Sequence, residues 1–321
     1  MTHKTLERLT LSGMTPSVTK VLGQSLPEMS SLQELVLTGC VGGILQAEEM
    51  EALFGRFNKT MPLNELTFSG FNVRGCLAPL IESLPFFPNL RKLHLEKLNI
   101  DEHDQCSLLK SFGSLTKLEM HTHRGTCRDS FHYYTSKDYK TLQLGVISLT
   151  PAVAAMLGRL LPEMSSLQEL ELTDFYGSIL QFEEMEALFG GFNKTVLLYE
   201  LIFAGFSVKS RLAPLFRSLR FFPNLLRLEL YDLNMDEHDL RGLLESFHFI
   251  PNLQKLDLSD NPLDHTVRSI VPHVINLKHL RRILLHGTTH SQDDVNYVRD
   301  TVQQALPELE ITTYVVSVPI P

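Results

Sequence analysis

The motif L-x-x-L-x-L recurs along the whole chain at intervals of about 25 to 31 residues. In the first half its central leucines stand at 9, 35, 66, 93 and 118, with steps of 26, 31, 27 and 25. The other central residues are Leu170, Leu201, Leu228, Leu256 and Ile283, with a weaker unit around Leu142-Gln-Leu144 and a last one at Leu309. A period of this length predicts a stacked array in which each repeat contacts only its neighbours.

Within each motif, the alternation L-x-L predicts a short strand with its leucines facing the core and the intervening residues facing out. Segments with helical periodicity lie between these strands, as in Glu183-Glu-Met-Glu-Ala-Leu-Phe189. The helices are predicted at 16–26, 47–57, 77–84, 102–112, 152–161, 182–192, 212–219, 237–247, 267–274 and 293–306. We therefore expect an α/β fold, with a parallel sheet on the concave side of an array and helices on its convex side.

A long block of the chain is present twice. Residues 26–104 return as residues 161–239, each position 135 later, with roughly two-thirds of the aligned residues identical. The irregular segment 121–139 joins the copies and reads as a degenerate repeat. Because the motif continues through it, we predict one domain, 1–321, of about 11 to 12 repeats lengthened by duplication.

Several residues stand where helix caps are needed. Thr15-Pro16 and Thr150-Pro151 place a hydroxyl before a proline at the first helical position. Asp101-Glu-His-Asp104 and its copy Asp236-Glu-His-Asp239 place a carboxylate at the cap and another in the first turn. The same cluster could hold a cation or serve acid-base chemistry, but capping explains it more simply, and it leaves His103 and His238 on the surface.

Charge and cysteine usage exclude several classes of protein. The net charge is −8 and the pI near 5.9, with Lys and Arg scattered, which disfavours nucleic acid and anionic membranes as partners. No apolar run is long enough to cross a bilayer. All four cysteines lie in the first half, and the copy replaces Cys40 and Cys76 by Phe175 and Arg211, so we predict free thiols and a cytoplasmic protein.

The units Leu63–Leu84 and Leu90–Asp104 carry a family resemblance. The chain resembles the ribonuclease-inhibitor type of leucine-rich repeat, and in these units the C-terminal repeats of NOD-like receptors, most closely those of the CARD-containing receptors that assemble with NAIP proteins. That resemblance implies a ligand-sensing and autoinhibitory domain in innate immunity. The chain has no G-x-x-x-x-G-K-[ST] loop and no CARD-like bundle, so it would be the sensor end alone, and we expect a fragment of a longer receptor.

The family pattern L-x-x-L-x-L-x-x-N also has Asn at its last position, where the Asn side chain forms hydrogen bonds to neighbouring turns. Only the unit Leu253–Asn261 supplies it. The equivalent positions are apolar: Cys40, Phe71, Leu98, Phe175, Phe206 and Leu233. We expect apolar packing to replace most of the asparagine ladder.

Catalysis and cofactor binding find no support in the sequence. No nucleophile, zinc-protease or phosphate-loop motif occurs, so we predict a non-enzyme without cofactor. His121, His123, Cys127 and His132 cluster in the irregular segment, but their spacing fits no specific zinc pattern, and a polar loop is the simpler interpretation. Asn58-Lys-Thr60 and Asn193-Lys-Thr195 match the glycosylation pattern; with no other sign of secretion we interpret them as incidental.

The candidate binding surface consists of side chains that point outward from the strands. In the first half they are Glu34, Glu65, Lys92, His94, Lys117 and Glu119; in the second half they are Glu169, Glu171, Glu200, Arg227, Glu229, Tyr231, Lys255, Asp257 and Arg282. Alternating charge of this kind suits a protein partner or other domains of the same receptor, with a microbial ligand as a further class. Solvated charges without a partner are the simpler alternative.

Three functions stay open on these residues. The first is the NOD-like receptor domain, the second a free-standing inhibitor or adaptor scaffold of ribonuclease-inhibitor type, and the third a secreted recognition receptor. The two copies agree in their helix cores but differ at outward positions such as Val36/Glu171, Thr67/Ile202 and His94/Glu229. We therefore expect the second half to bind something other than the first half binds.

Overall fold

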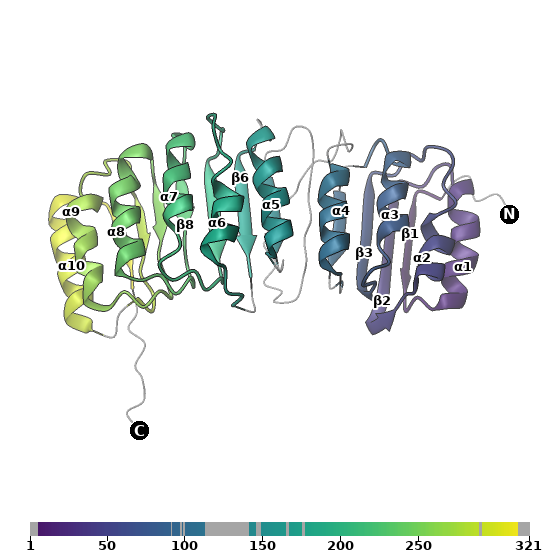
Figure 1. The fold of residues 1–321 in the computed structure, drawn as a ribbon, viewed down its shortest axis with the longest axis horizontal. Coiled ribbons are helices and arrows are strands. Elements are labelled where there is room, and N and C mark those ends of the chain that lie inside the picture. The colour runs from purple at the N-terminus through teal and green to yellow at the C-terminus, as the bar shows by residue number, and fades with distance from the viewer. Residues whose placement is uncertain are drawn as a thin grey trace, which may run out of the picture. The chain divides into compact units, whose positions relative to one another are not determined.

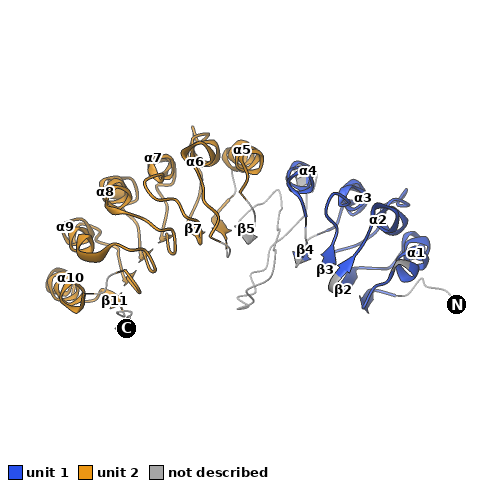
Figure 2. Cartoon of the chain, turned by 60° about the horizontal axis from the view of Figure 1, so that its bottom comes forward, with its two compact units in different colours: residues 1–146 blue, residues 147–321 orange. Residues whose placement is uncertain are grey.

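The computed structural model describes residues 6–90, 92–96, 98, 100–112, 141–145, 149–164, 167–174, 177–288 and 291–313. Its contacts divide the chain into two compact units, unit 1 at Met1–Val146 and unit 2 at Ile147–Pro321 (Figure 2). We describe each unit by itself. The irregular segment 121–139 and the repeat around Leu118 lie outside the described residues, and the single domain 1–321 stays a prediction.

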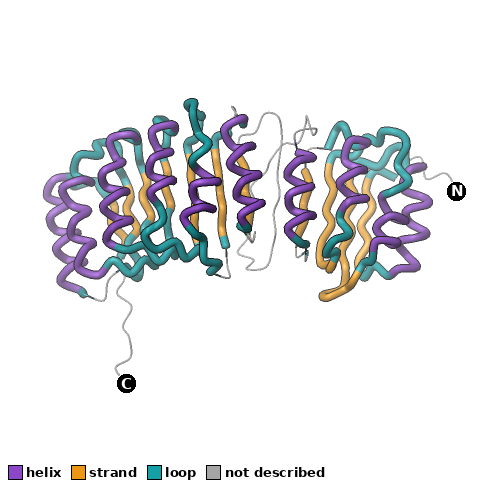
Figure 3. The backbone as a smooth tube through the Cα atoms, viewed as in Figure 1, coloured by secondary structure: helices purple, strands orange, loops and turns teal. Residues whose placement is uncertain are grey.

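Unit 1 is a run of strand–helix repeats whose strands form a parallel sheet in chain order (Figures 1 and 3). Its strands are β1 (Arg8–Ser12), β2 (Glu34–Ile44), β3 (Glu65–Asn72) and β4 (Lys92–Glu96). Its helices are α1 (Pro16–Ser25), α2 (Ala47–Phe54), α3 (Ala78–Ser83) and α4 (Glu102–Phe112). The strand β5 (Thr141–Gly145) precedes the boundary between the units and confirms the weak repeat at Leu142-Gln-Leu144.

Unit 2 repeats this plan. Its parallel strands are β6 (Glu169–Thr173), β7 (Glu200–Ala204), β8 (Arg227–Glu229), β9 (Lys255–Asp257), β10 (Arg282–Leu284) and β11 (Glu310–Thr312). Its helices are α5 (Pro151–Leu160), α6 (Phe182–Phe189), α7 (Ala213–Ser218), α8 (Glu237–Ser246), α9 (Val271–Val274) and α10 (Gln292–Ala305). Figure 2 shows the helices of this unit along the outer side and the strands along the inner side. The predicted α/β leucine-rich-repeat architecture is confirmed.

Register in both sheets follows the L-x-L pattern. Leu66 pairs with Leu35 and Leu93 in unit 1, and Leu228 pairs with Leu201 and Leu256 in unit 2, and all six are at most 1% exposed. Every inward position therefore stacks on the inward position of the next repeat. In each unit the core contains a column of leucines lying between the sheet and the helices.

Buried apolar side chains stand where the asparagine is missing at the described positions Phe71, Leu98, Phe206 and Leu233, as predicted. Phe71 stacks on Phe68 with ring centroids 4.5 Å apart, and the copy repeats the arrangement with Phe206 on Phe203 at 4.8 Å. Both outer rings are at most 2% exposed. Asn261 is the asparagine that the family pattern places at this position, and it is fully buried. Its Oδ1 accepts from the backbone N–H groups of Leu233 and Met235, and its Nδ2 donates to three carbonyls.

Most helix boundaries match the predictions, with three corrections. The helices predicted at 47–57 and 182–192 end three residues early, at Phe54 and Phe189, where Gly55 and Gly190 follow. The helix predicted at 267–274 is a 3-10 helix, Asp264–Ile270, followed by α9. Pro272 in the first turn of α9 lacks the N–H that a continuous α-helix requires.

The predicted caps hold at three of four helices. Asp101 and Asp236 accept from the N–H groups of Asp104 and Asp239, and the Thr150 hydroxyl accepts from Val153. Thr15 is at the cap position of α1, but its side chain accepts no capping bond. Its φ of −117°, against −67° at Thr150, gives its side chain a different orientation to the following helix.

Among the described residues, Cys76 and Cys106 take part in no disulfide. Within the described part of the chain, no helix combines the length and apolar character needed to cross a membrane.

Candidate functional site

The outward strand positions of unit 2 align into two rows along one face of its sheet. The first row is Glu169, Glu200, Arg227, Lys255, Arg282 and Glu310. The second is Glu171, Ile202, Glu229, Asp257, Leu284 and Thr312. We call this surface, together with Tyr231 just beyond β8, the strand face of unit 2. It brings together all nine second-half residues of the predicted surface.

Four charged residues in the middle of the strand face bind one another. Arg227 pairs with Glu200 on the preceding strand, with Nη1 and Oε1 3.0 Å apart, and also with Glu229 on its own strand. Lys255 on the next strand pairs with Glu229 as well. The side chain of Glu229 is only 7% exposed, so its charge depends on these two cations. The alternating charges are thus a bonded network across three repeats rather than independently solvated groups.

Burial governs the protonation of this network. It is the largest influence on Glu200, where it raises the pKa of the carboxyl with help from Glu169 and Glu229, while Arg227 acts in the opposite direction. Hydrogen bonds and ion pairs to Glu229 and Glu200 outweigh burial at Arg227 and raise its pKa. The cation is therefore held firmly charged between two carboxylates.

Tyr231 is half-buried in acidic surroundings. Burial first, and then the charges of Glu171, Glu229 and Asp257, raise the pKa of its hydroxyl to about 12. Burial and Asp260 likewise raise the pKa of the neighbouring Asp232. Tyr231 consequently stays a neutral hydroxyl, with an apolar ring and a polar tip of the kind that anchors protein interfaces.

Unit 1 presents a different set of residues on its strand face. Glu34 pairs with Arg8 at 2.6 Å, and Glu65 lies between Glu34 and Lys92 in the register. His94 is on β4 opposite Thr67 by backbone pairing. Lys117 and Glu119 lie outside the described residues.

The duplicated Asp-Glu-His-Asp motif proves to be a clamp between repeats. Asp104 accepts from the N–H groups of Gly75 and Leu77 in the previous repeat, at 2.7 and 3.1 Å. Asp239 binds Ser210 and Leu212 in the same way, at 2.6 and 3.1 Å. Both carboxylates are 2% exposed, whereas His103 and His238 are on the surface. The capping interpretation is confirmed.

The other candidate sites gain little from the structure. His121, His123, Cys127 and His132 lie outside the described residues, and elsewhere no group of three His, Cys, Asp or Glu residues is arranged to hold a metal. Asn58 and Asn193 are exposed in turns after α2 and α6.

Sequence reasoning missed two features of the site. Glu310, which pairs with Arg282, is itself in an outward strand position and could have been found by extending the rows to the last repeat. A groove on the helical face of unit 2 also escaped notice, although the substitution of Ser107 by Gly242 between the copies pointed to it.

No family model matches the sequence. Among solved structures, the chain is similar to a protein from Bacteroides fragilis, with 18% identity over 83% of this chain and 69% of that chain and a TM-score of 0.39. It is also similar to TLR13 in complex with ssRNA13, with 15% identity, 98% and 44% coverage and a TM-score of 0.43. A third is a leucine-rich-repeat protein of Leptospira interrogans, with 16% identity, 96% and 90% coverage and a TM-score of 0.32. The leucine-rich-repeat assignment rests on the chain's own repeats.

Proposed function

We propose that this chain is a non-enzymatic, protein-binding leucine-rich-repeat domain whose strand face in unit 2 holds its partner. The supporting observation is the neutral Tyr231 among Glu171, Glu229 and Asp257, beside a charge network fixed in place before any partner arrives. An aromatic anchor on a preorganised surface lowers the cost of ordering side chains on binding. The partner expected here is a protein that presents cationic or hydrogen-bond-donating groups to this surface.

The particular role we propose is the cytoplasmic ligand-sensing and autoinhibitory end of a NOD-like innate immune receptor. This role rests on the repeat resemblance, and it makes another domain of the same receptor the partner in the resting state. The first test is to read the full transcript. A nucleotide-binding domain encoded ahead of Met1 supports the role, whereas its absence favours the free-standing inhibitor or adaptor scaffold.

The second test addresses the strand face directly. Where the upstream domain exists, it is expressed separately and titrated with residues 1–321 by calorimetry. We expect Tyr231→Ala to weaken this binding by about 30-fold, the effect of losing one interface hot spot. Arg241→Ala on the helical face is the matched control and should bind like the parent chain. Equal affinity of the Tyr231 variant would remove the strand face from the proposal.

The secreted-receptor alternative has its own measurement. A loss of mass on treating the native protein with an N-glycosidase, at Asn58 or Asn193, would place the chain in the secretory pathway and overturn the cytoplasmic role.

A further inference from the structure

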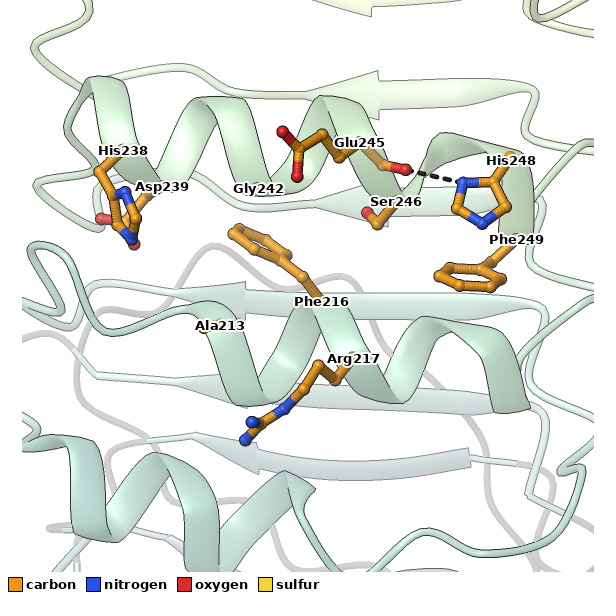
Figure 4. Close-up of a pocket in the computed structure, with 10 residues that line it drawn as sticks. All are labelled: Ala213, Phe216, Arg217, His238, Asp239, Gly242, Glu245, Ser246, His248 and Phe249. Carbon is orange, nitrogen blue, oxygen red and sulfur yellow. Dashed lines mark hydrogen bonds between the residues drawn. The ribbon is translucent and has the colours of Figure 1, made fainter.

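A groove of about 310 Å³ lies between α7 and α8 on the helical face of unit 2 (Figure 4). Phe216 on α7 and Phe249 just after α8 supply its aromatic walls, and Gly242 on α8 faces Phe216. Glu245 and His248 stand at one part of its rim and His238 at another. Its volume suits a single large side chain rather than an extended peptide.

Gly242 lets the Phe216 ring lie close against α8, where the ring forms one wall of the groove. Figure 4 shows Phe216 extending from α7 toward this position. A Cβ atom added to Gly242 would come within 3.0 Å of Cδ2 of the Phe216 ring, closer than such contacts normally are. Any larger residue there would push the Phe216 ring aside and change this wall of the groove.

The charged groups around the groove differ in whether they already have a partner. Arg217 forms an ion pair with Glu186 on α6, and Figure 4 shows its guanidinium turned away from Gly242. Asp239 is occupied by backbone N–H groups of the previous repeat. The backbone oxygen of Glu245 lies 2.7 Å from Nδ1 of His248, but its carboxylate has no ion pair or hydrogen bond within the described residues. Glu245 is thus the acidic group open to a ligand.

The first copy lacks this arrangement at the same positions. Ser107 stands where Gly242 does, Ile81 where Phe216 does, and Lys110 where Glu245 does. The aromatic wall, the glycine beside it and the acidic rim are therefore present at the unit 2 positions and absent from the equivalent unit 1 positions, while the clamp residue Asp104/Asp239 is unchanged.

We propose that this groove binds an arginine side chain of a partner protein. The alkyl part of arginine would pack on Phe216, and its guanidinium would pair with Glu245 while stacking on the side of Phe249 that the His248 ring leaves uncovered. Arginine fits these groups better than lysine because its planar cation both stacks on aromatic rings and bonds a carboxylate through two N–H groups. The site lies on the helices, not the strand face, and is independent of the function proposed above.

The test uses short blocked peptides as probes. Acetyl-Ala-Arg-Ala-amide is titrated into ¹⁵N-labelled residues 1–321, with the Lys, Leu and Glu peptides of the same form as comparisons. We expect saturable shifts of the backbone amide signals of Gly242 and Ser246 with the Arg peptide, weaker ones with Lys, and none with Glu. The absence of shifts at these residues with the Arg peptide, or equal shifts with the Leu peptide, overturns the proposal.

Two variants import the residues of the first copy. Gly242→Ser displaces the Phe216 wall of the groove and Glu245→Lys reverses the charge of its rim. Each should weaken binding of the Arg peptide at least about tenfold, a difference of about 1.4 kcal/mol. Glu245 is exposed, so the Glu245→Lys chain remains folded even if Gly242→Ser does not. Arg241→Ala, on the same helix but outside this groove, should bind like the parent. Unchanged affinity in Glu245→Lys would show that the carboxylate is not the recognition group.

Discussion

At the scale of single residues, the duplication places different side chains in the same surroundings. Gln105 and Leu240 are equivalent positions on α4 and α8, and both are buried, at 4% and 1% exposure. Oε1 of Gln105 has no hydrogen-bond partner in the described part of the chain. The second copy shows that the site accepts leucine without strain.

We therefore expect Gln105→Leu to raise the free energy of unfolding by roughly 1–2 kcal/mol, because an unsatisfied buried polar atom carries a cost of that order. Denaturant unfolding followed by circular dichroism gives the value. The reciprocal change, Leu240→Gln, should destabilise the chain, and a stabilising effect there would contradict the argument.

Gly205 is a second informative residue. Its φ is +78°, and a Cβ atom would lie 1.6 Å from the backbone oxygen of Asp174. Gly177 has a similar φ of +67° but open space around it. We expect Gly177→Ala to cost about 1 kcal/mol from backbone strain alone, and Gly205→Ala at least about 3 kcal/mol. Similar losses in the two variants, measured by thermal unfolding, would show that crowding at Gly205 is relieved by backbone movement.

The raised pKa of Tyr231 predicts how the stability of the folded chain changes with pH. Since the folded chain keeps this proton to about pH 12 whereas an ordinary tyrosine loses it near 10, the folded state binds more protons between these values. The contribution of Tyr231 to stability is thus fully present below pH 10 and is lost as pH rises toward 12.

The check for Tyr231 is an NMR titration of ring Cζ in ¹³C-labelled tyrosine. The signal missing from Tyr231→Phe should remain at its protonated position at pH 10, the ordinary tyrosine value. A midpoint at that pH would contradict the acidic, half-buried setting of Tyr231.

At the scale of elements, two devices join one repeat to the next. Stacked phenylalanines pack at this position in two repeats that lack the asparagine, and hydrogen bonds of Asn261 join the turns in the repeat that has it. Asn261→Ala would leave two buried N–H groups and three carbonyls with one partner fewer. We expect a loss of about 3 kcal/mol in the free energy of unfolding, as for a broken buried network.

The control for Asn261 is Asn252→Ala, which removes one exposed side-chain bond and should change stability by less than about 0.5 kcal/mol. Equal effects in the two variants, measured by denaturant unfolding, would mean that the turns hold together without the Asn261 side chain.

Periodicity predicted these elements well, because a strand or helix depends on which residues recur and at what spacing. Every described L-x-L motif is a strand, and α4 begins and ends as expected, at Glu102 and Phe112. The 3-10 helix at Asp264–Ile270 was missed because its apolar spacing resembles that of an α-helix. The ion pairs of Arg227 depend on side-chain rotamers, and the groove at Gly242 depends on a position without a side chain. The spacing of residues in the sequence predicts neither.

At the scale of the whole molecule, the two compact units suggest separate folding. A repeat array is held together by contacts between neighbours, so a fragment with several complete repeats retains most of its stability. We expect residues 147–321 alone to give a cooperative thermal transition, and Asn261→Ala to lower its midpoint. A fragment without a transition in calorimetry would show that unit 2 requires unit 1.

The absence of any insertion or deletion between residues 26–104 and 161–239 has a genetic consequence. Two similar stretches of coding sequence at a fixed spacing favour misaligned recombination, which removes or adds 135 residues in one event. Such an event begins and ends at equivalent points of a strand–helix unit, so every inward leucine keeps its place. We therefore expect inherited length variants of this gene to differ by that whole block, and to encode proteins that still fold.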